Sequence, residues 1–458
     1  MSVSEFDSYR PPEPAGGRKK RRRGGGASSG AGSAAGAQGG ADAQAGGQRS
    51  AGGRGRGWAN RGAEGNREMP MVEDVEFTSY YGRPIVKAPP WGDEISAYLF
   101  LGGLAGGSTL LALGAHLTDR PVMRMTARFT ALGATALGGL ALIEDLGRPE
   151  RFLNMMRTVK VTSPMSLGTW ILSGFGAGAG TTAVIEVDRL TGERLPLGPL
   201  RRVLHALETP AAIESALFAA PLAAYTGVLL GATAVPTWNA AGRNGLPLVF
   251  VSSASVAAGG AAMMTAPVRE AGPARLMALA GAAGDVVAMG AMKKRMHPVE
   301  VEPMETGEPG RKLHRAERLL LAGAVGAAAV EVGARLLRRK LDGAGGTSAA
   351  STSAAGAGAA AAAHAVAGAA ASAVSKGAGA GRLGGLLRPG WKTRTVLRAA
   401  SVVSGAALAA ASAYTRFGVL EAGIESTKDP RHVVEPQRAR LEARRARGIT
   451  HDSITTAG

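Results

Sequence analysis

From residue 95 onward, long apolar runs alternate with charged connectors. The first run, ISAYLFLGGLAGGSTLLALGA at 95–115, carries no formal charge. A soluble amphipathic helix repeats polar residues on one face, whereas an uninterrupted apolar run of about 20 residues suits a helix that crosses a bilayer. Windows of this kind fall at 95–117, 124–146, 166–187, 212–234, 246–265, 272–292, 316–337 and 394–416. The pattern predicts an all-α, polytopic integral membrane protein with about eight transmembrane helices, together with a transmembrane core at 85–341 and a last span within 393–438.

Two segments break this pattern. Residues 1–84 consist mainly of Gly, Ala, Ser, Gln and Arg, which bury too little apolar area to offset the entropy of ordering, so we expect a disordered basic tail. The Gly/Ala-rich segment at 342–392 is expected to form a flexible loop because it lacks strongly apolar side chains over most of its length. A ninth span at about 353–375 is the alternative for that segment. Residues 439–458 form a charged C-terminal tail.

The tail also guides the expected orientation. It contains KKRRR at 19–23, and no signal peptide precedes the first apolar run, so we expect a cytoplasmic N-terminus. An even number of spans would place the C-terminus on the same side of a bacterial plasma membrane. Attraction of the tail to anionic lipid headgroups is favoured over RNA binding through Arg54, Arg56 and Trp58, and nucleic acid is not expected as a partner.

Small residues are frequent in the spans. Gly102 with Gly106, and Gly103 with Gly107, form small-xxx-small pairs in the first span. Lipid gives helices no hydrophobic reason to associate, so close backbone approach must stabilise their packing. We expect these glycines to pack against helices of the same chain, and a homodimer contact is the alternative.

The composition excludes several kinds of redox centre on this chain. Its 458 residues include no cysteine, so it has no disulfide framework and no cysteine-ligated iron–sulfur cluster. His116 and His205 lie at span ends and do not form a pair of haem ligands within the apolar belt. The 53 basic and 35 acidic residues give a net charge of +18.

Few ionisable residues fall within the apolar windows. Asp285 and Glu331 have apolar neighbours on both sides, and Glu144 and Asp145 end the second span. A charge costs several kcal/mol in hydrocarbon, so each is a candidate for proton handling. The equally favoured alternative is a structural hydrogen bond or ion pair.

The connector EDLGRPERFLNMMRTVKVTSPMSLGTW at 144–170 is the most informative stretch. Pro149 suits the first turn of a short helix, and Ser163 followed by Pro164 predicts the cap of the third span. Arg148, Arg151 and Arg157 would face headgroups or a partner. The mixture of charge, caps and interfacial residues favours a docking surface or the mouth of a site.

This connector, together with APPWGDEISAYLFLGGLAGGSTLLA at 88–112 and TRFGVLEAGIESTKDPRHVVEPQR at 415–438, resembles the polysulfide reductase membrane-subunit family, also called the NrfD family. The resemblance covers about residues 85–438. It implies spans arranged as two four-helix bundles. It also implies a quinone-interacting membrane anchor of an oxidoreductase, which docks an iron–sulfur subunit that serves a molybdopterin catalytic subunit.

The resemblance also implies where a quinone, such as menaquinone, would bind. The matching positions are Tyr98 in the first span and Tyr225 in the fourth, and either tyrosine could instead belong to an interfacial aromatic belt. Glu144, Asp145 and Arg148 are candidates for the pocket mouth or for proton exchange, alongside Asp285 and Glu331, and Arg151 and Arg157 are candidates for partner docking. Because the chain can hold neither haem nor clusters, a bound partner would supply or accept the electrons. A structural anchor without quinone reactivity and a proton or small-solute transporter are the alternatives.

Overall fold

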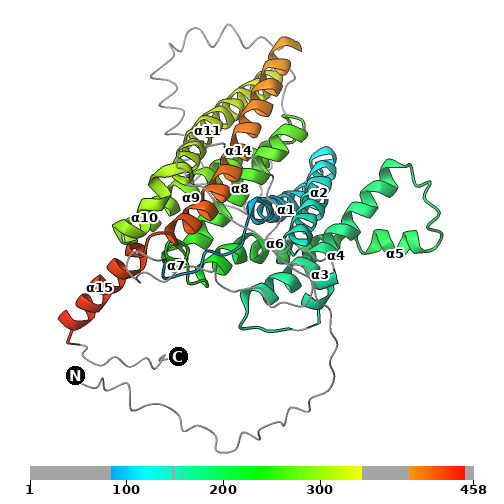
Figure 1. The fold of residues 1–458 in the computed structure, drawn as a ribbon. Helices are drawn as coiled ribbons and strands as arrows, with labels where there is room; N and C mark the ends of the chain where they lie inside the picture. Colours follow the sequence, from blue (N-terminus) through cyan, green and yellow to red (C-terminus); the bar gives the residue numbers. More distant parts are fainter. Residues whose placement is uncertain (1–83, 147–149, 158, 343–390, 449–458) are drawn as a thin grey trace, which may run out of the picture. The chain divides into compact units, whose positions relative to one another are not determined.

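The computed structural model describes residues 84–146, 150–157, 159–342 and 391–448, which form helices and no strands (Figure 1). The predicted N-terminal tail up to residue 83, the segment 343–390 with its possible ninth span, and residues 449–458 lie outside the described residues. In chain order the helices are α1 (Asp93–Leu117), α2 (Pro121–Asp145), α3 (Glu150–Met155), α4 (Pro164–Leu190), α5 (Leu200–Ala206), α6 (Glu208–Gly231), α7 (Pro236–Arg243), α8 (Leu246–Thr265), α9 (Gly272–Arg295), α10 (Pro298–Glu305), α11 (Gly307–Asp342), α14 (Trp391–Ser426) and α15 (Arg431–Ala446).

Each of the eight predicted spans coincides largely with one long helix: α1, α2, α4, α6, α8, α9, α11 or α14. Among the described residues, seven helices are long and apolar enough to cross a membrane, and α4 is not one of them. Repeated glycines and threonines, and the acidic Glu186 and Asp188, lower the apolar character of α4. The all-helical architecture with several candidate membrane-spanning helices is therefore confirmed, and the count of eight spans stays a prediction.

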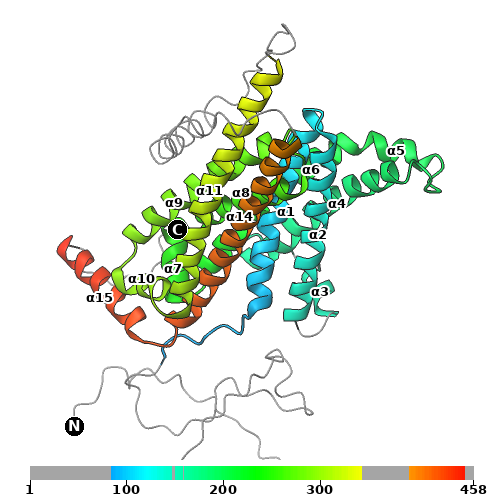
Figure 2. The same ribbon diagram turned by 90° about the horizontal axis from the view of Figure 1, so that it is seen from above.

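The helices pack in two connected sets. The first contains α1, α2, α4 and α6, and the second contains α8, α9, α11 and α14. Helices α11 and α14 lie side by side along most of their lengths in both views (Figures 1 and 2). Helix α8 also packs against α1 and α6, so the contacts continue from one set to the other. The division into two separate bundles remains a prediction.

Helix α1 packs against α2, α6 and α8, and its glycines allow two of these approaches. A Cβ atom on Gly106 would lie 2.7 Å from the carbonyl oxygen of Ala219 on α6. One on Gly107 would lie 2.6 Å from the Cβ of Ala258 on α8. The expected tight packing within the chain is confirmed at these positions, whereas a Cβ on Gly102 would meet open space.

Candidate functional site

A cavity of about 100 Å³ lies among α1, α2, α3, α4 and α6. Tyr98, Asp145 and Tyr225 all line it, although they are far apart in the sequence. Most of the remaining wall is apolar and includes Leu142, Met155, Met165 and Leu172. The structure thus brings together three of the residues selected from the sequence, in a small space suited to a ring rather than to a drug-sized ligand.

Each tyrosine ring lies next to a glycine of a neighbouring helix, and the approach is closest for Tyr225. Tyr98 is 5% exposed, and a Cβ atom on Gly138 of α2 would lie 3.4 Å from its ring. The ring of Tyr225 lies so close to Gly168 of α4 that a side chain there would overlap it. Neither tyrosine hydroxyl has a hydrogen-bond partner among the described residues. Two donors therefore remain available next to the cavity.

Acidic groups meet at the end of α2. Asp145 is half-buried, lines the cavity and interacts electrostatically with Glu94 in the first turn of α1. Glu144 is exposed and does not line the cavity. Arg148, the third candidate at this position, lies outside the described residues.

The connector from α2 to α4 covers part of the cavity. It contains the predicted short helix, α3, whose last residue Met155 lines the cavity. The hydroxyl of Ser163 accepts a hydrogen bond from the backbone N–H of Ser166, and Pro164 begins α4, so the predicted cap is confirmed. Arg157 is exposed just after α3, and the side chain of Arg151 lies outside the described residues.

The C-terminal motif at 415–438 contacts the cavity wall through a pair of stacked tryptophans. Trp91, which lines the cavity, stacks on Trp238 of α7 at 5.3 Å between ring centroids. The indole N–H of Trp238 donates to the carbonyl oxygen of Val419 over 2.8 Å, and its ring lies against Gly423. Two residues of the sequence motif therefore act by holding a tryptophan pair next to the site.

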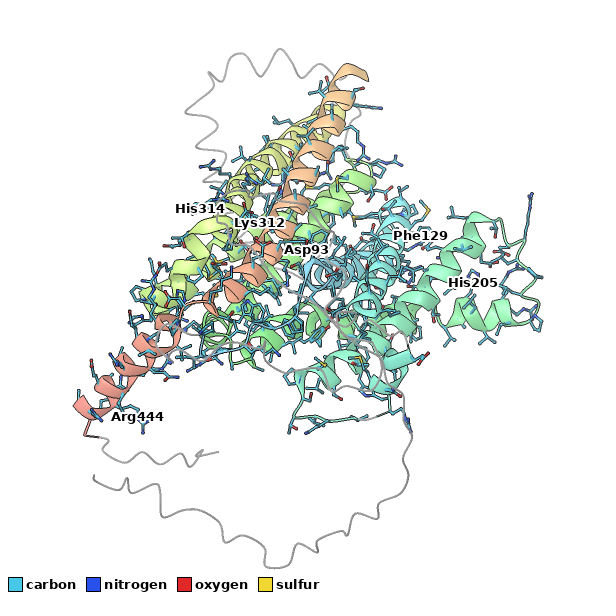
Figure 3. The ribbon with its side chains drawn as sticks, in the orientation of Figure 1. Asp93, Phe129, His205, Lys312, His314 and Arg444 are labelled. Atoms are coloured by element: carbon cyan, nitrogen blue, oxygen red, sulfur yellow. The ribbon has the colours of Figure 1, made fainter. Side chains whose placement is uncertain are left out.

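The motif ends in a turn between α14 and α15. The carboxylate of Asp429 accepts from the backbone N–H of Arg431 over 2.9 Å and pairs with its guanidinium. These interactions hold the pKa of Asp429 below its ordinary value. Lys312 of α11, shown in Figure 3, forms an ion pair with Glu421 of α14. These charged residues of the motif thus stabilise the local structure at the end of α14.

A buried ionic cluster links α2, α4 and α6 at their ends away from the cavity. Arg128 is 3% exposed, and its Nη1 atom donates to Glu186 and to Glu208, each over 2.8 Å. Arg189 donates to both oxygens of Glu208. Near this cluster, the Nε2 atom of His205, which is labelled in Figure 3, lies 3.0 Å from the Oδ2 atom of Asp188. The sequence analysis missed this cluster, although charges inside two predicted spans, at Arg128 and Glu186, were a signal for it.

Asp285 and Glu331 have different surroundings. Asp285 is 7% exposed and interacts electrostatically with Arg416, whose guanidinium lies 3.8 Å from the ring centroid of Phe250. Glu331 accepts from Arg275 over 2.6 Å and from Arg335 over 2.7 Å. The two carboxylates line different cavities. The structure therefore does not bring them together, and Glu331 lies in an ion-paired cluster.

Comparison with known protein families gives a match over part of the chain. Residues 85–276 match the family model described as polysulphide reductase, NrfD, and this stretch contains every residue that lines the cavity. No curated protein matches the chain. Proteins of this family are membrane subunits of polysulfide reductase-like oxidoreductase complexes. Residues 85–276 thus resemble this family, in agreement with the motifs at 88–112 and 144–170, and the motif at 415–438 lies outside the matched residues.

Proposed function

We propose that this chain is the quinone-interacting membrane anchor of a respiratory oxidoreductase and binds the quinone head group in the cavity lined by Tyr98, Asp145 and Tyr225. The observation that carries the proposal is the meeting of two unpartnered hydroxyl donors and one carboxylate in a mostly apolar space. A planar ring with two opposed carbonyl oxygens needs such donors together with apolar walls.

The chemistry of each side chain follows from its position. A bound quinone supplies reversible transfer of two electrons and two protons. The hydroxyls of Tyr98 and Tyr225 would donate hydrogen bonds to the ring oxygens and so fix its orientation. Asp145 would hold or release a proton at a carboxylate oxygen, with Glu94 next to it at the end of α1. The apolar walls would exclude water from the ring.

The electrons would come from, or pass to, an iron–sulfur subunit of a molybdopterin enzyme. The chain has no cysteine and cannot hold such a cluster by thiolates. The connector that carries Arg151 and Arg157 lies next to the cavity through α3 and provides the expected docking surface. A partner bound there would place its cluster on the side of the molecule where the quinone ring lies.

Binding of a short-chain menaquinone analogue tests the quinone site. The full chain, reconstituted in lipid nanodiscs, is titrated while tryptophan fluorescence is followed, because Trp91 lines the cavity. Loss of one hydrogen bond to a neutral carbonyl should weaken binding about two- to tenfold in Tyr98→Phe and in Tyr225→Phe. Tyr414→Phe is the matched control, since that tyrosine lies on α14 and does not line the cavity. Equal affinity of all four proteins would favour a structural anchor without quinone reactivity.

Copurification tests the partner. The tagged chain, extracted from its native membrane in mild detergent, should retain a subunit with cysteine-ligated clusters, detectable by its iron content and mass. A double variant, Arg151→Gln with Arg157→Gln, should retain less of that subunit than Arg315→Gln with Arg318→Gln, which makes the same charge change on α11. Equal retention would remove the connector from the docking surface.

A transporter remains the alternative from another class. It would need Asp285 and Glu331 on one substrate path, and these residues line separate cavities. The quinone proposal is favoured because its candidate residues share one space.

A further inference from the structure

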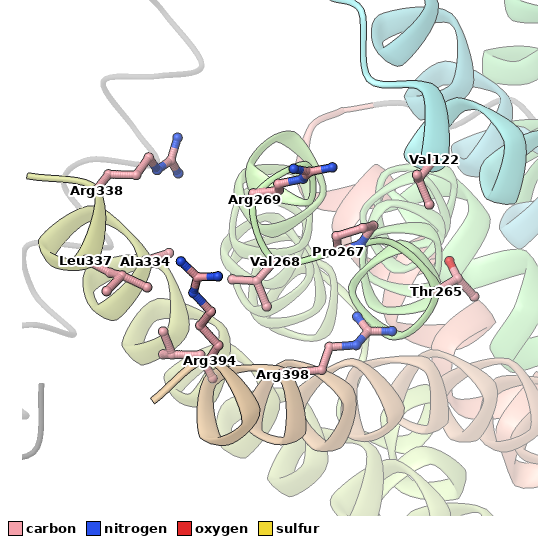
Figure 4. Close-up of a pocket in the computed structure, with 11 residues that line it drawn as sticks. Val122, Thr265, Pro267, Val268, Arg269, Ala334, Leu337, Arg338, Arg394 and Arg398 are labelled. Atoms are coloured by element: carbon pink, nitrogen blue, oxygen red, sulfur yellow. The ribbon is translucent and has the colours of Figure 1, made fainter. Parts of the chain in front are cut away.

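A second and larger cavity, of about 520 Å³, lies where α8, α11 and α14 end or begin. Four arginines line it, Arg269, Arg338, Arg394 and Arg398, and they come from three parts of the chain (Figure 4). Between them the wall is apolar and includes Val122, Val268, Leu337 and Leu397. The cavity thus combines cationic groups with an apolar surface large enough for part of a lipid.

The four arginines differ in whether the protein itself provides hydrogen-bond partners for their guanidinium groups. Arg398 donates to three carbonyl oxygens at the end of α8, those of Met263, Met264 and Ala266, and so serves as a helix cap. Arg338 and Arg394 form no hydrogen bond or ion pair with any other described residue. Arg394 extends between α11 and the loop that joins α8 to α9 (Figure 4). At least two guanidinium groups at the cavity are therefore free to bind an anion.

The part of the chain that the structure describes offers little negative charge to neutralise these arginines. Arg269 has an 82% exposed side chain, and the carboxylate of Glu270, 3.9 Å from it, already accepts the backbone N–H groups of Val122 and Met123. The next carboxylate, Glu331, is paired with Arg275 and Arg335. The segment 343–390, which follows α11 in the sequence, contains no aspartate or glutamate. Among the described residues, no free carboxylate lines this cavity to neutralise Arg338 and Arg394.

The position of the cavity indicates which anion. In the sequence, the apolar run of α11 ends at Leu337, just before Arg338, that of α14 begins after Arg394, and α8 ends at Thr265. The arginines therefore lie at the level where a span meets the lipid headgroups, and the apolar wall continues toward the hydrocarbon. The arginines at headgroup level match the charged headgroup of an anionic phospholipid, and the apolar wall matches its acyl chain.

We propose that this cavity is a binding site for an anionic phospholipid, whose phosphate pairs with Arg338 and Arg394 and whose acyl chain lies against Val268, Leu337 and Leu397. Arginine suits this role because its planar guanidinium binds phosphate through two parallel hydrogen bonds. Arg269 adds charge at the opening. The site is separate from the cavity lined by Tyr98 and does not depend on quinone binding.

Native mass spectrometry of the full chain tests the proposal. The protein is exchanged into mixed micelles that contain equal amounts of phosphatidylglycerol and phosphatidylcholine, and the retained lipids are counted. The wild type should retain phosphatidylglycerol in preference to phosphatidylcholine, and the preference should fall about fivefold for each arginine removed in Arg338→Gln and Arg394→Gln. Arg315→Gln with Arg318→Gln, on exposed positions of the same α11, should leave it unchanged.

Two further measurements in the same experiment identify the ligand as a lipid rather than a free phosphate. Leu337→Asn should weaken retention of the lipid while the arginines remain, because the acyl chain loses apolar contact. Glycerol phosphate, which carries the headgroup charge without acyl chains, should not displace the lipid. Equal retention of both lipids by the wild type, an unchanged preference in the Arg338→Gln and Arg394→Gln double variant, or displacement by glycerol phosphate would each overturn the proposal. Circular dichroism of each variant checks that its helix content is that of the wild type.

Discussion

At the scale of single residues, Gly168 shapes the candidate quinone site. It allows the ring of Tyr225 on α6 to lie against the backbone of α4, and Thr169 and Leu172 of the same helix line the cavity. Any side chain at residue 168 must move the tyrosine or separate the two helices. The position of one hydroxyl donor therefore depends on the absence of a side chain on another helix.

Gly168→Ala should displace Tyr225 and weaken binding of the menaquinone analogue by at least as much as Tyr225→Phe. Gly176→Ala, on the same helix, is the matched control because its Cβ atom would meet nothing within 4 Å. Alanine also favours the helix by about 1 kcal/mol relative to glycine, so the control should be neutral or stabilising. The fluorescence titration described above measures both proteins. If Gly168→Ala binds the menaquinone analogue as tightly as the wild type, Tyr225 does not contact the quinone ring.

Glu208 should contribute to stability through the buried cluster with Arg128 and Arg189. Removal of one member of a buried ion pair leaves the other charge uncompensated, so Glu208→Gln should lower the free energy of unfolding by about 3 kcal/mol. Thermal unfolding in detergent, followed by circular dichroism, measures the change. Glu317→Gln, at an exposed position on α11, should have little effect. Similar melting temperatures for the two variants would contradict a stabilising role for the cluster.

The sequence could indicate individual site residues but not their partners. Tyr98 and Tyr225 follow from the family resemblance and Asp145 from its place at the end of the second span, and their convergence depends on helix packing that one sequence does not specify. Asp285 and Glu331 were considered together because both lie in apolar windows, yet they have different arginine neighbours. Hydropathy shows that a buried charge needs a partner, and only the fold shows which one.

At the scale of elements, the helices follow the apolar windows but extend beyond several of them. Helix α11 begins at Gly307, before the predicted span at 316–337, and α14 continues to Ser426, beyond the predicted end at 416. A hydropathy window records the part of a helix that suits hydrocarbon, whereas backbone hydrogen bonds continue through charged turns. Helix positions were therefore predictable, and their ends were not.

The junction of α14 with α7 depends on Gly423. Gly423→Ala would force the indole of Trp238 away from the carbonyl oxygen of Val419, and we expect a loss of about 1–3 kcal/mol in unfolding free energy from overpacking. Because Trp238 stacks on Trp91, near-ultraviolet circular dichroism should change as well. Gly290→Ala on α9, where a Cβ would meet open space, is the control. A spectrum and stability equal to those of the control would show that the contact tolerates a methyl group.

At the scale of the whole molecule, the crossing of α4 decides the topology. The chain has no cysteine, so a single introduced thiol reports one position. Lys160 precedes α4 and Arg194 follows it, and both are exposed. If α4 spans the bilayer, a membrane-impermeant maleimide added to intact cells should label only one of Lys160→Cys and Arg194→Cys. Labelling of both, or of neither until the cells are opened, would mean that α4 does not cross.

The enclosed position of α1 has a consequence for biogenesis. In α1 and in α8 alike, 72% of the most apolar stretch is buried within the protein, and Gly107 joins the two helices. At about 5–20 residues per second of translation, α8 leaves the ribosome roughly 7–30 s after α1. During that interval the side of α1 that carries Gly107 lacks the helix against which it packs, so an insertase or chaperone that shields nascent spans would act on that side.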